Sequence, residues 1–483
     1  MATQAAPGTS TGTSAAGPEP AGVVERLRDA ARSLVEGRRV ILAGFPVAAG
    51  TPTVTLLRAL GAERCFVLGP TVGTGALPDP ADAEWLSLDI EAPDTIAVFR
   101  HFERATAHPS ADLVEALDRF DPGRDALVLV APYDTSTTVA GRPAFGARRP
   151  AWVAVEDKTT NDALFDRAGV ARPPSIVVAS EDVDGLRVAQ AALDAGSGTV
   201  WAGDARDGFN GGGILVRWVV DDGTAAAARA TMAARCARVR VAPFLDGVPC
   251  SIHGMVTGDG IAVFRPVEMV TLRTTDPPGF RYGGAATFFD PPPADRAAMR
   301  EAARRVGAVL HDEVGFAGSF GIDGVLTAEG FLPTELNPRM GGGLGAVARA
   351  LPDLPLLPLH WLAAAERPLP VSAAEIEDTV VAAADTRRAG GGWTMISTRL
   401  AETTEHPVIV RDGRCLPAGT ATPDGTLQAG PGAEGGFVNF QADPDRTPVG
   451  PSVAPRVCAV LAWADSALGL GLGPLHPATP ADR

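Results

Sequence analysis

The stretch that decides the fold reads Gly330-Phe331-Leu332-Pro333-Thr334-Glu335-Leu336-Asn337-Pro338-Arg339. Glu335, Asn337 and Arg339 alternate along it, so on a β-strand all three side chains point to one face. Carboxylate and carbonyl oxygens bind Mg2+, which shares its coordination shell with phosphates. A guanidinium grips phosphoryl oxygens in a bidentate manner. The pattern predicts a site for a metal-bound phosphate; the plain alternative is an edge strand with a solvated polar face.

A second strand is expected immediately before this one, over Gly318 to Leu326, with a hairpin turn at 327–330. The whole hairpin resembles the metal-binding hairpin of the ATP-grasp superfamily, whose last strand carries Glu-x-Asn-x-Arg. That family has an acidic residue on the preceding strand, and Asp323 stands at the matching position. The resemblance implies that Asp323, Glu335 and Asn337 hold Mg2+, with Mn2+ as an alternative ion, and that Arg339 is catalytic.

The lysine content of the chain is unusual. Of the 42 basic residues, 41 are arginines and only Lys158 is a lysine. It follows Glu156-Asp157 and precedes a stretch with helical character that ends near Gly169. ATP-grasp enzymes similarly have an Asp-Lys pair at the start of a helix, which implies that Lys158 contacts the nucleotide phosphates and takes part in catalysis. The alternative is that this lysine was retained by chance in an arginine-rich chain.

Two further segments are candidate nucleotide contacts. Asn210, Gly211, Gly212 and Gly213 form a glycine-rich loop between two expected strands, and backbone N–H groups of such a loop can cradle phosphates. The resemblance implies that the segment Phe244-Leu245-Asp246 contacts the nucleoside. The family's second phosphate-binding lysine is missing from the first lid strand, and Arg206 or Arg217 is expected to supply the charge.

The region from 262 to 284 corresponds to the acceptor side in ATP-grasp enzymes. Its charged residues are candidates for gripping a substrate carboxylate or ammonium, with solvated surface charge as the alternative for each. They are Arg265, Glu268, Arg273 and Arg281.

Composition limits the partners and the compartment. The net charge is −15 and no basic stripe stands out, so nucleic acid is not an expected partner. No apolar run approaches the roughly 18–20 residues of a membrane span. The five cysteines are scattered, which argues for a reducing cytoplasm and against a zinc site or disulfide framework. The sequence leaves a homodimer open.

The predicted fold is α/β. We expect a disordered leader over 1–21, a Rossmann-like pre-ATP-grasp domain over 22–150, a small lid subdomain over 151–240 and a large subdomain with the metal site over 241–370. A β-rich domain is expected over 371–483. It has short β-like runs at 380–384, 393–397, 408–410 and 436–440 and a closing helix at 454–468.

The resemblance implies an ATP- and Mg2+-dependent ligase. It would activate the carboxylate of an amino acid or small acid as an acyl phosphate and join it to an amine, releasing ADP and phosphate. The absence of a biotin-carrier motif argues against a carboxylase. Two alternatives remain from the sequence: ligation to a hydroxyl or thiol acceptor, and a catalytically weak ATP- or metabolite-binding subunit.

Overall fold

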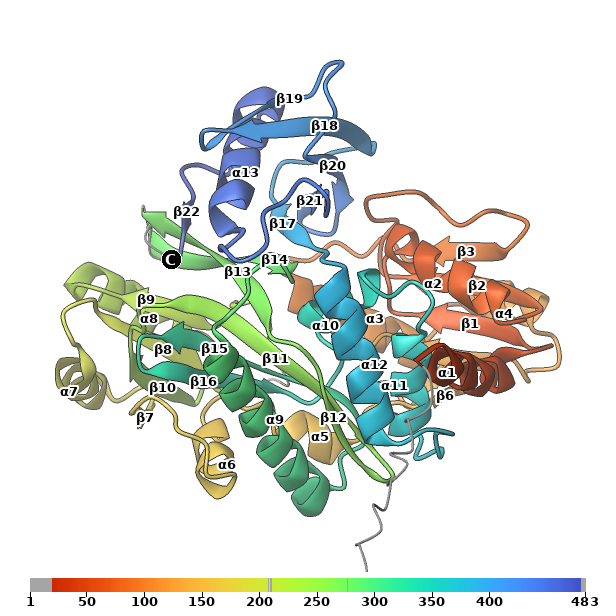
Figure 1. Cartoon of the computed structure of the whole chain (residues 1–483), viewed down its shortest axis with the longest axis horizontal. Helices are drawn as coiled ribbons and strands as arrows, with labels where there is room; N and C mark the ends of the chain where they lie inside the picture. Colours follow the sequence, from red (N-terminus) through yellow and green to blue (C-terminus); the bar gives the residue numbers. More distant parts are fainter. Residues whose placement is uncertain (1–19, 207, 209–210, 276, 479–483) are drawn as a thin grey trace, which may run out of the picture.

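The computed structural model describes residues 20–206, 208, 211–275 and 277–478. Four β-sheets with packed helices make up the described chain, which confirms the predicted α/β fold. In Figure 1 the N-terminal unit (red to orange) and the lid (yellow to olive) lie on opposite sides of the central sheet, and the C-terminal sheet (blue) lies above it. Most of the expected leader lies outside the described residues. Among the described residues, no helix has the length and apolar character needed to cross a membrane.

The N-terminal unit is a sheet in the order β3-β2-β1-β4-β6-β5, parallel throughout except for the last strand. Val40 to Ala43 and Leu127 to Val130 are buried without interruption, as parallel strands with both faces covered are. The strands are β1 (Arg39–Ala43), β2 (Arg64–Gly69), β3 (Ala83–Ser87), β4 (Leu127–Val130), β5 (Thr138–Val139) and β6 (Arg142–Phe145). The helices are α1 (Pro20–Val35), α2 (Val47–Ala59), α3 (Thr95–Ala107) and α4 (Ala111–Phe120).

The lid is a four-stranded antiparallel sheet in the order β7-β10-β8-β9. Its own core gathers around the buried Trp201 and Met232. Two short helices, α5 (Pro150–Ala154) and α6 (Asn161–Arg167), lead into it. The other elements are β7 (Ile176–Ala179), α7 (Val183–Leu193), β8 (Thr199–Gly203), β9 (Val216–Val219), α8 (Asp222–Arg235) and β10 (Arg238–Pro243).

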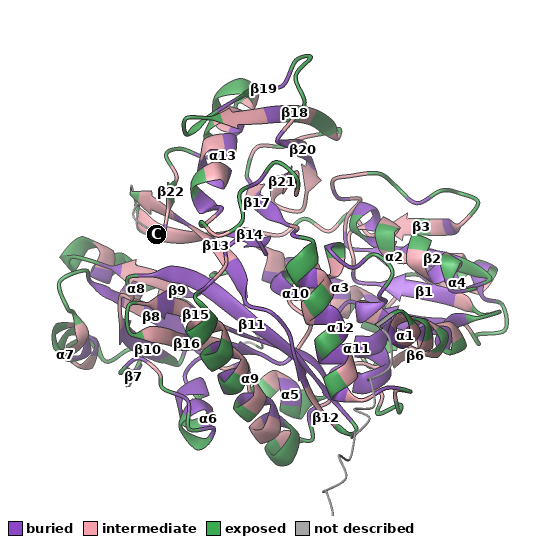
Figure 2. Cartoon of the chain, in the orientation of Figure 1, coloured by how far each residue is buried: buried purple, intermediate pink, exposed green. Residues whose placement is uncertain are grey.

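The central sheet carries the predicted hairpin. Its order is β14-β13-β11-β15-β16, and β11 is buried at every position (Figure 2). The strands are β11 (Val248–Thr257), β12 (Gly260–Val263), β13 (Val267–Thr275), β14 (Pro278–Ala286), β15 (Gly318–Thr327) and β16 (Gly330–Asn337). The helices that follow or cover it are α9 (Pro293–Val314), α10 (Gly342–Arg349), α11 (Leu356–Ala364) and α12 (Ala373–Thr386).

One sequence prediction in this region is wrong. Residues 380–384, expected as a β-like run, lie inside α12. Ser372 and Glu375 form a capping box that starts this helix, and Ile376 and Val380 then fall four residues apart on its buried face. That face joins the hydrophobic core of the N-terminal unit, so the residues after 371 do not all belong to a β-rich unit.

The C-terminal sheet is antiparallel, in the order β17-β21-β20-β18-β19. The expected closing helix is present as α13 (Ala454–Leu468), which packs on this sheet. The strands are β17 (Gly391–Ile396), β18 (Thr404–Arg411), β19 (Arg414–Pro417), β20 (Gly425–Gly432) and β21 (Gly435–Ala442). A final short strand, β22 (His476–Pro477), returns to pair with β13 of the central sheet.

Candidate active site

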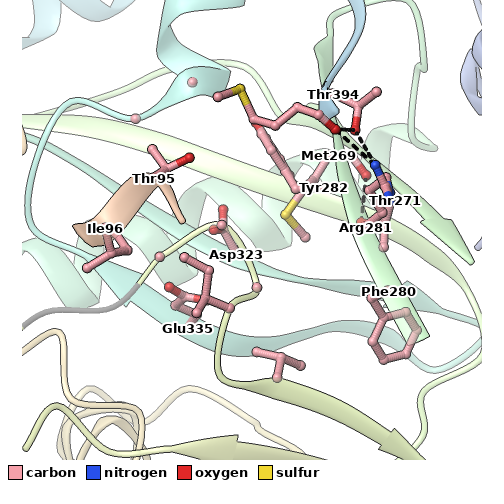
Figure 3. Close-up of a pocket in the computed structure, with 18 of the residues that line it drawn as sticks. Thr95, Ile96, Met269, Thr271, Phe280, Arg281, Tyr282, Asp323, Glu335 and Thr394 are labelled. Atoms are coloured by element: carbon pink, nitrogen blue, oxygen red, sulfur yellow. Dashed lines mark hydrogen bonds between the residues drawn. The ribbon is translucent and has the colours of Figure 1, made fainter. Parts of the chain in front are cut away.

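A cavity of about 1220 Å³ lies between the four sheets. Its walls come from the N-terminal unit, the lid, the central sheet and the C-terminal sheet. Figure 3 shows part of its lining, including Asp323 and Glu335 from the hairpin and Arg281 from β14. All the residues that the hairpin motif nominated, Asp323, Glu335, Asn337 and Arg339, line it.

The hairpin brings the predicted metal ligands together. Asp323 on β15 lies opposite Glu335 on β16, and Asn337 lies opposite Gly321. Asp323 Oδ2 accepts a hydrogen bond of 2.9 Å from Asn337 Nδ2, and its Oδ1 accepts one of 2.5 Å from Ser251 on β11. Burial raises the pKa of Asp323 to about 6, and the nearby Glu335 carboxylate adds to the rise. A bound cation would favour the ionised form of this carboxyl.

The residue types fit Mg2+. Two carboxylates and one amide oxygen are hard donors, and phosphate and water oxygens commonly complete an octahedral Mg2+ shell. Among the described residues, no group of three or more His, Cys, Asp or Glu side chains is arranged for a metal. Asp323, Glu335 and Asn337 can fill only part of an octahedral shell, so this donor set suits an ion that is shared with a phosphorylated ligand.

Lys158 lies beside the carboxylates of the hairpin. Its Nζ is 2.9 Å from Glu335 Oε1, and its side chain is only 4% exposed. The start of α6 is tied to the hairpin because Asn161 Oδ1 accepts a 3.0 Å hydrogen bond from the backbone N–H of Leu336. Asn161 also donates to the carbonyl of Val155, which fixes the loop that carries the lysine.

Arg339 is held by Asn337, a predicted metal ligand, and by Glu156, which the sequence analysis did not nominate. Its Nε donates to Glu156 Oε1 at 2.7 Å, and its Nη2 donates to Asn337 Oδ1 at 2.7 Å. Glu156 also pairs with Arg148 at 2.8 Å. Although burial disfavours the charge, Arg148 and Arg339 hold the pKa of Glu156 below its usual range. Glu156 therefore fixes the orientation of the guanidinium, which also reaches Asn337. Its position two residues before Lys158 was the available signal.

The lid faces the cavity with its glycines and arginines. Gly211, Gly212 and Gly213 line the cavity, whereas Asn210 lies outside the described residues. Of the two arginines expected to replace the missing lysine, Arg217 lines the cavity and donates to the carbonyls of Ile214 and Val216. Arg206 instead reaches the carbonyl of Ala234 on the lid. Arg217 is thus the better-placed of the two.

Two other lid arginines also line the cavity, and each is paired with a different aspartate. Arg240 is held in a bidentate pair by Asp162, with both contacts at 2.8 Å. Arg235 reaches Asp94 of the N-terminal unit at 3.4 Å. Neither was nominated from the sequence.

The segment Phe244-Leu245-Asp246, which follows β10 and is called the hinge below, contributes to the cavity lining. Phe244 and Leu245 line the cavity, but Asp246 is not among its described lining residues. Phe244 stacks on Trp218 of β9, with ring centroids 5.1 Å apart, and Trp218 stacks on Phe280 of β14 at 5.7 Å. This aromatic stack joins the lid to the central sheet.

The four acceptor-side candidates separate into different places. Arg281 lines the cavity. Arg265 is 2% exposed and pairs with Asp290 and Asp385, so the structure places it in an internal ion-pair cluster. Glu268 is fully buried and accepts hydrogen bonds from Ser452 and from the backbone N–H groups of Val453 and Ala454 at the start of α13. Arg273 lies over the Trp218 ring at 5.8 Å and reaches the carbonyl of Pro477.

Arg265, Glu268 and Arg273 are thus engaged by side chains and backbone outside the cavity lining of the described chain. For these three, the geometry favours structural roles.

No family model matches the sequence, and no curated protein matches it. Solved structures with similar folds include a phosphoribosylamine–glycine ligase from Thermotoga maritima, at 13% identity and a TM-score of 0.49, covering 91% of this chain and 97% of that one. An N5-carboxyaminoimidazole synthase from Aspergillus clavatus, in complex with ADP and 5-aminoimidazole ribonucleotide, is 12% identical with a TM-score of 0.48 and covers 84% and 94%.

The biotin carboxylase domain of a Hydrogenobacter thermophilus 2-oxoglutarate carboxylase, with MgADP and bicarbonate, is also similar. Its identity is 12% and its TM-score 0.49, with coverage of 84% and 86%.

Proposed function

We propose that the protein is an ATP-grasp ligase that joins a carboxylate to an amine with release of ADP and phosphate. The observation that carries the proposal is the convergence of Asp323, Glu335, Asn337, Arg339 and Lys158 at one part of a single cavity. A structural ion-pair network would not need an amide and a carboxylate facing the same cavity as a glycine-rich lid loop.

Each group has a role in this proposal. Asp323, Glu335 and Asn337 would hold Mg2+, which would supply positive charge to neutralise the phosphates of ATP. Lys158 and the loop at 211–213 hold phosphate oxygens, and the hinge at Phe244 and Leu245 holds the nucleoside. Small-molecule substrates and free buried thiols suit a cytoplasmic enzyme.

The chemistry has two steps. A carboxylate oxygen of the first substrate attacks the γ-phosphorus, the bond to the β-phosphate oxygen breaks, and ADP leaves. The resulting acyl phosphate is then attacked at its carbonyl carbon by the amine nitrogen, which loses a proton as phosphate leaves and an amide forms. Arg339, oriented by Glu156, stabilises the charge on the transferred phosphoryl group. The remaining lowering of the activation barrier comes from the cavity walls, which hold the two substrates in the reactive orientation.

Two alternative functions would use the same site. A hydroxyl or thiol acceptor would use the same first step, and product analysis separates it from an amine. A weak binding subunit is motivated by the missing lid lysine, but such a subunit has no need for the metal carboxylates that the chain retains. Tight ATP binding without any substrate-stimulated ADP release would favour that reading.

The test measures ADP and phosphate release with ATP, Mg2+ and pooled carboxylates and amines. We expect release that requires both a carboxylate and an amine. Glu335→Gln should abolish this release while the protein remains folded, because the variant loses a metal ligand. Glu405→Gln, on the exposed part of β18, is the matched control. Unchanged turnover by Glu335→Gln would refute the metal assignment.

A further inference from the structure

The cavity extends beyond the phosphate-facing residues to the C-terminal sheet, where Arg281 is held in place. Its Nη1 donates to Thr394 Oγ1 at 3.2 Å and to the carbonyl of Met395 at 3.0 Å, both on β17. Among the described residues, Nε and Nη2 of this guanidinium have no hydrogen-bond partner. A cation that is fixed through one nitrogen and keeps further donors beside a cavity is suited to a carboxylate ligand.

A carboxylate of the protein lines the same cavity. Glu434 lies at the turn between β20 and β21, and its Oε1 accepts a 2.8 Å hydrogen bond from Thr95 at the start of α3. No ion pair joins Glu434 to Arg281 in the described structure, yet the two charges influence one another. Burial lowers the pKa of Arg281, and the charge of Glu434 opposes that shift. Geometry places the two charges near each other and not in contact, because Ile396, the residue after Met395, pairs with Gly436, two residues after Glu434.

Apolar side chains complete this part of the cavity. Tyr282 of β14 meets the edge of Trp393 at 5.0 Å between ring centroids, and Trp393 lies 5.5 Å from Phe437 of β21. Met269 and Met395 also line the cavity. A separated cation and anion beside an aromatic and thioether wall match the three parts of an apolar α-amino acid: carboxylate, ammonium and side chain.

We propose that an α-amino acid with an apolar side chain binds here, with its carboxylate on Arg281 and its ammonium facing Glu434, and that it is the amine substrate. The assignment as amine substrate rests on the proposed ligase function. Figure 3 shows Arg281 and Thr394 on one side of the drawn pocket, with Asp323 and Glu335 on the other. A carboxylate held by Arg281 is therefore kept away from the end of the cavity that carries Asp323 and Glu335. The amino group is the group left to react, once its ammonium has given a proton to the Glu434 carboxylate.

The binding test uses the full chain with Mg2+ and a non-hydrolysable ATP analogue, followed by calorimetry. The probes are L-leucine, 4-methylpentanoate, which lacks the ammonium, and 3-methylbutylamine, which lacks the carboxylate. Because each lost charge-assisted contact is worth roughly a 10- to 100-fold change in affinity, wild type should prefer leucine over both analogues by that factor. L-Serine should bind more weakly than L-leucine, because it fills none of the apolar wall.

Two variants assign the charges. Glu434→Gln should remove the preference for leucine over 4-methylpentanoate and leave the affinity for 4-methylpentanoate unchanged. Arg281→Gln should remove the preference for leucine over 3-methylbutylamine. Arg399→Gln, whose exposed side chain pairs with the exposed Glu91, is the matched control and should bind as wild type does.

Several outcomes would overturn the assignment. They are wild-type affinity for leucine in both charge variants, equal affinity for leucine and its two analogues, and stronger binding of serine than of leucine. Binding as expected, without leucine-stimulated ADP release under any carboxylate, would count against the ligase function and the substrate role while supporting the binding site. Retained folding of the variants is checked by their melting temperature.

Discussion

Replacing Lys158 with methionine tests the proposed phosphate-binding role of this residue. Methionine keeps the length and apolar stem of lysine and removes only the ammonium. The ammonium lies 2.9 Å from Glu335 Oε1, with side-chain exposures of 4% for Lys158 and 22% for Glu335. Two losses are expected, one in stability and one in nucleotide binding, and they have different causes.

The magnitudes follow from the surroundings. Breaking a fully buried ion pair by removing one partner costs about 3–5 kcal/mol. Glu335 keeps some contact with water, so we expect a smaller cost of about 1–3 kcal/mol and a melting temperature lower by a few degrees. The lost contact to a phosphate oxygen, at about 1.5–3 kcal/mol, should weaken ATP binding by roughly 10- to 140-fold.

A double-mutant cycle with Glu335→Gln distinguishes the loss in stability from the loss in ATP binding. The stability cost of Lys158→Met should disappear when Glu335 is already glutamine, because no carboxylate is left unpaired. The loss in ATP binding should persist in that background. Melting curves and calorimetry on the four proteins of this cycle give both quantities, with Arg399→Gln as control. If the binding loss also vanished in the Glu335→Gln background, Lys158 would act only by holding Glu335, and its phosphate role would be refuted.

Three further predictions concern other parts of the chain. Burial raises the pKa of Glu268 from 4.5 to about 7, so the folded state keeps its proton and stability should fall by on the order of 3 kcal/mol as the pH rises through that interval. Glu268→Gln should flatten this fall in the melting temperature, and parallel pH profiles would contradict the reasoning. Asp424 is 1% exposed and accepts hydrogen bonds from Arg411 and Arg446, whose side chains are 52% and 34% exposed. Because both arginines keep contact with water, Asp424→Asn should lower the free energy of unfolding by about 1–3 kcal/mol and leave the ATP affinity unchanged; an unaltered melting temperature would exclude this. Trp218→Ala should raise the KM for ATP by roughly 5- to 140-fold by removing two ring stacks of about 0.5–1.5 kcal/mol each, and an unchanged KM would show that the aromatic stack does not hold the lid over the nucleotide.

The hairpin was predictable because its information is local. Alternation places Glu335 and Asn337 on one face whatever the rest of the chain does, and a short turn fixes the partner strand that carries Asp323. Lys158 was found for a different reason, because it is the only residue of its type. Its contact with Glu335 spans 177 positions in the chain, and no periodicity in the sequence encodes that distance.

The charged residues of the acceptor side were harder to assign. The pairing of Arg265 with Asp385 and the capping of α13 by Glu268 depend on segments 120 and 184 residues away. The sequence alone does not distinguish these structurally engaged side chains from Arg281, which lines the cavity. The error at 380–384 has a similar cause: a run of valine and alanine suits either a strand or a buried helix, and the capping box at Ser372 decides between them.

The construction of the cavity separates two tasks onto different parts of the chain. The residues proposed to bind phosphate and metal come mainly from the hairpin and the loop before α6, whereas much of the opposite wall comes from β17 and the β20–β21 turn. Changes in that turn can alter which molecule is admitted without altering the atoms that handle the phosphoryl group. The C-terminal sheet is therefore the natural place to exchange or diversify when a library of altered substrate preferences is wanted from this scaffold.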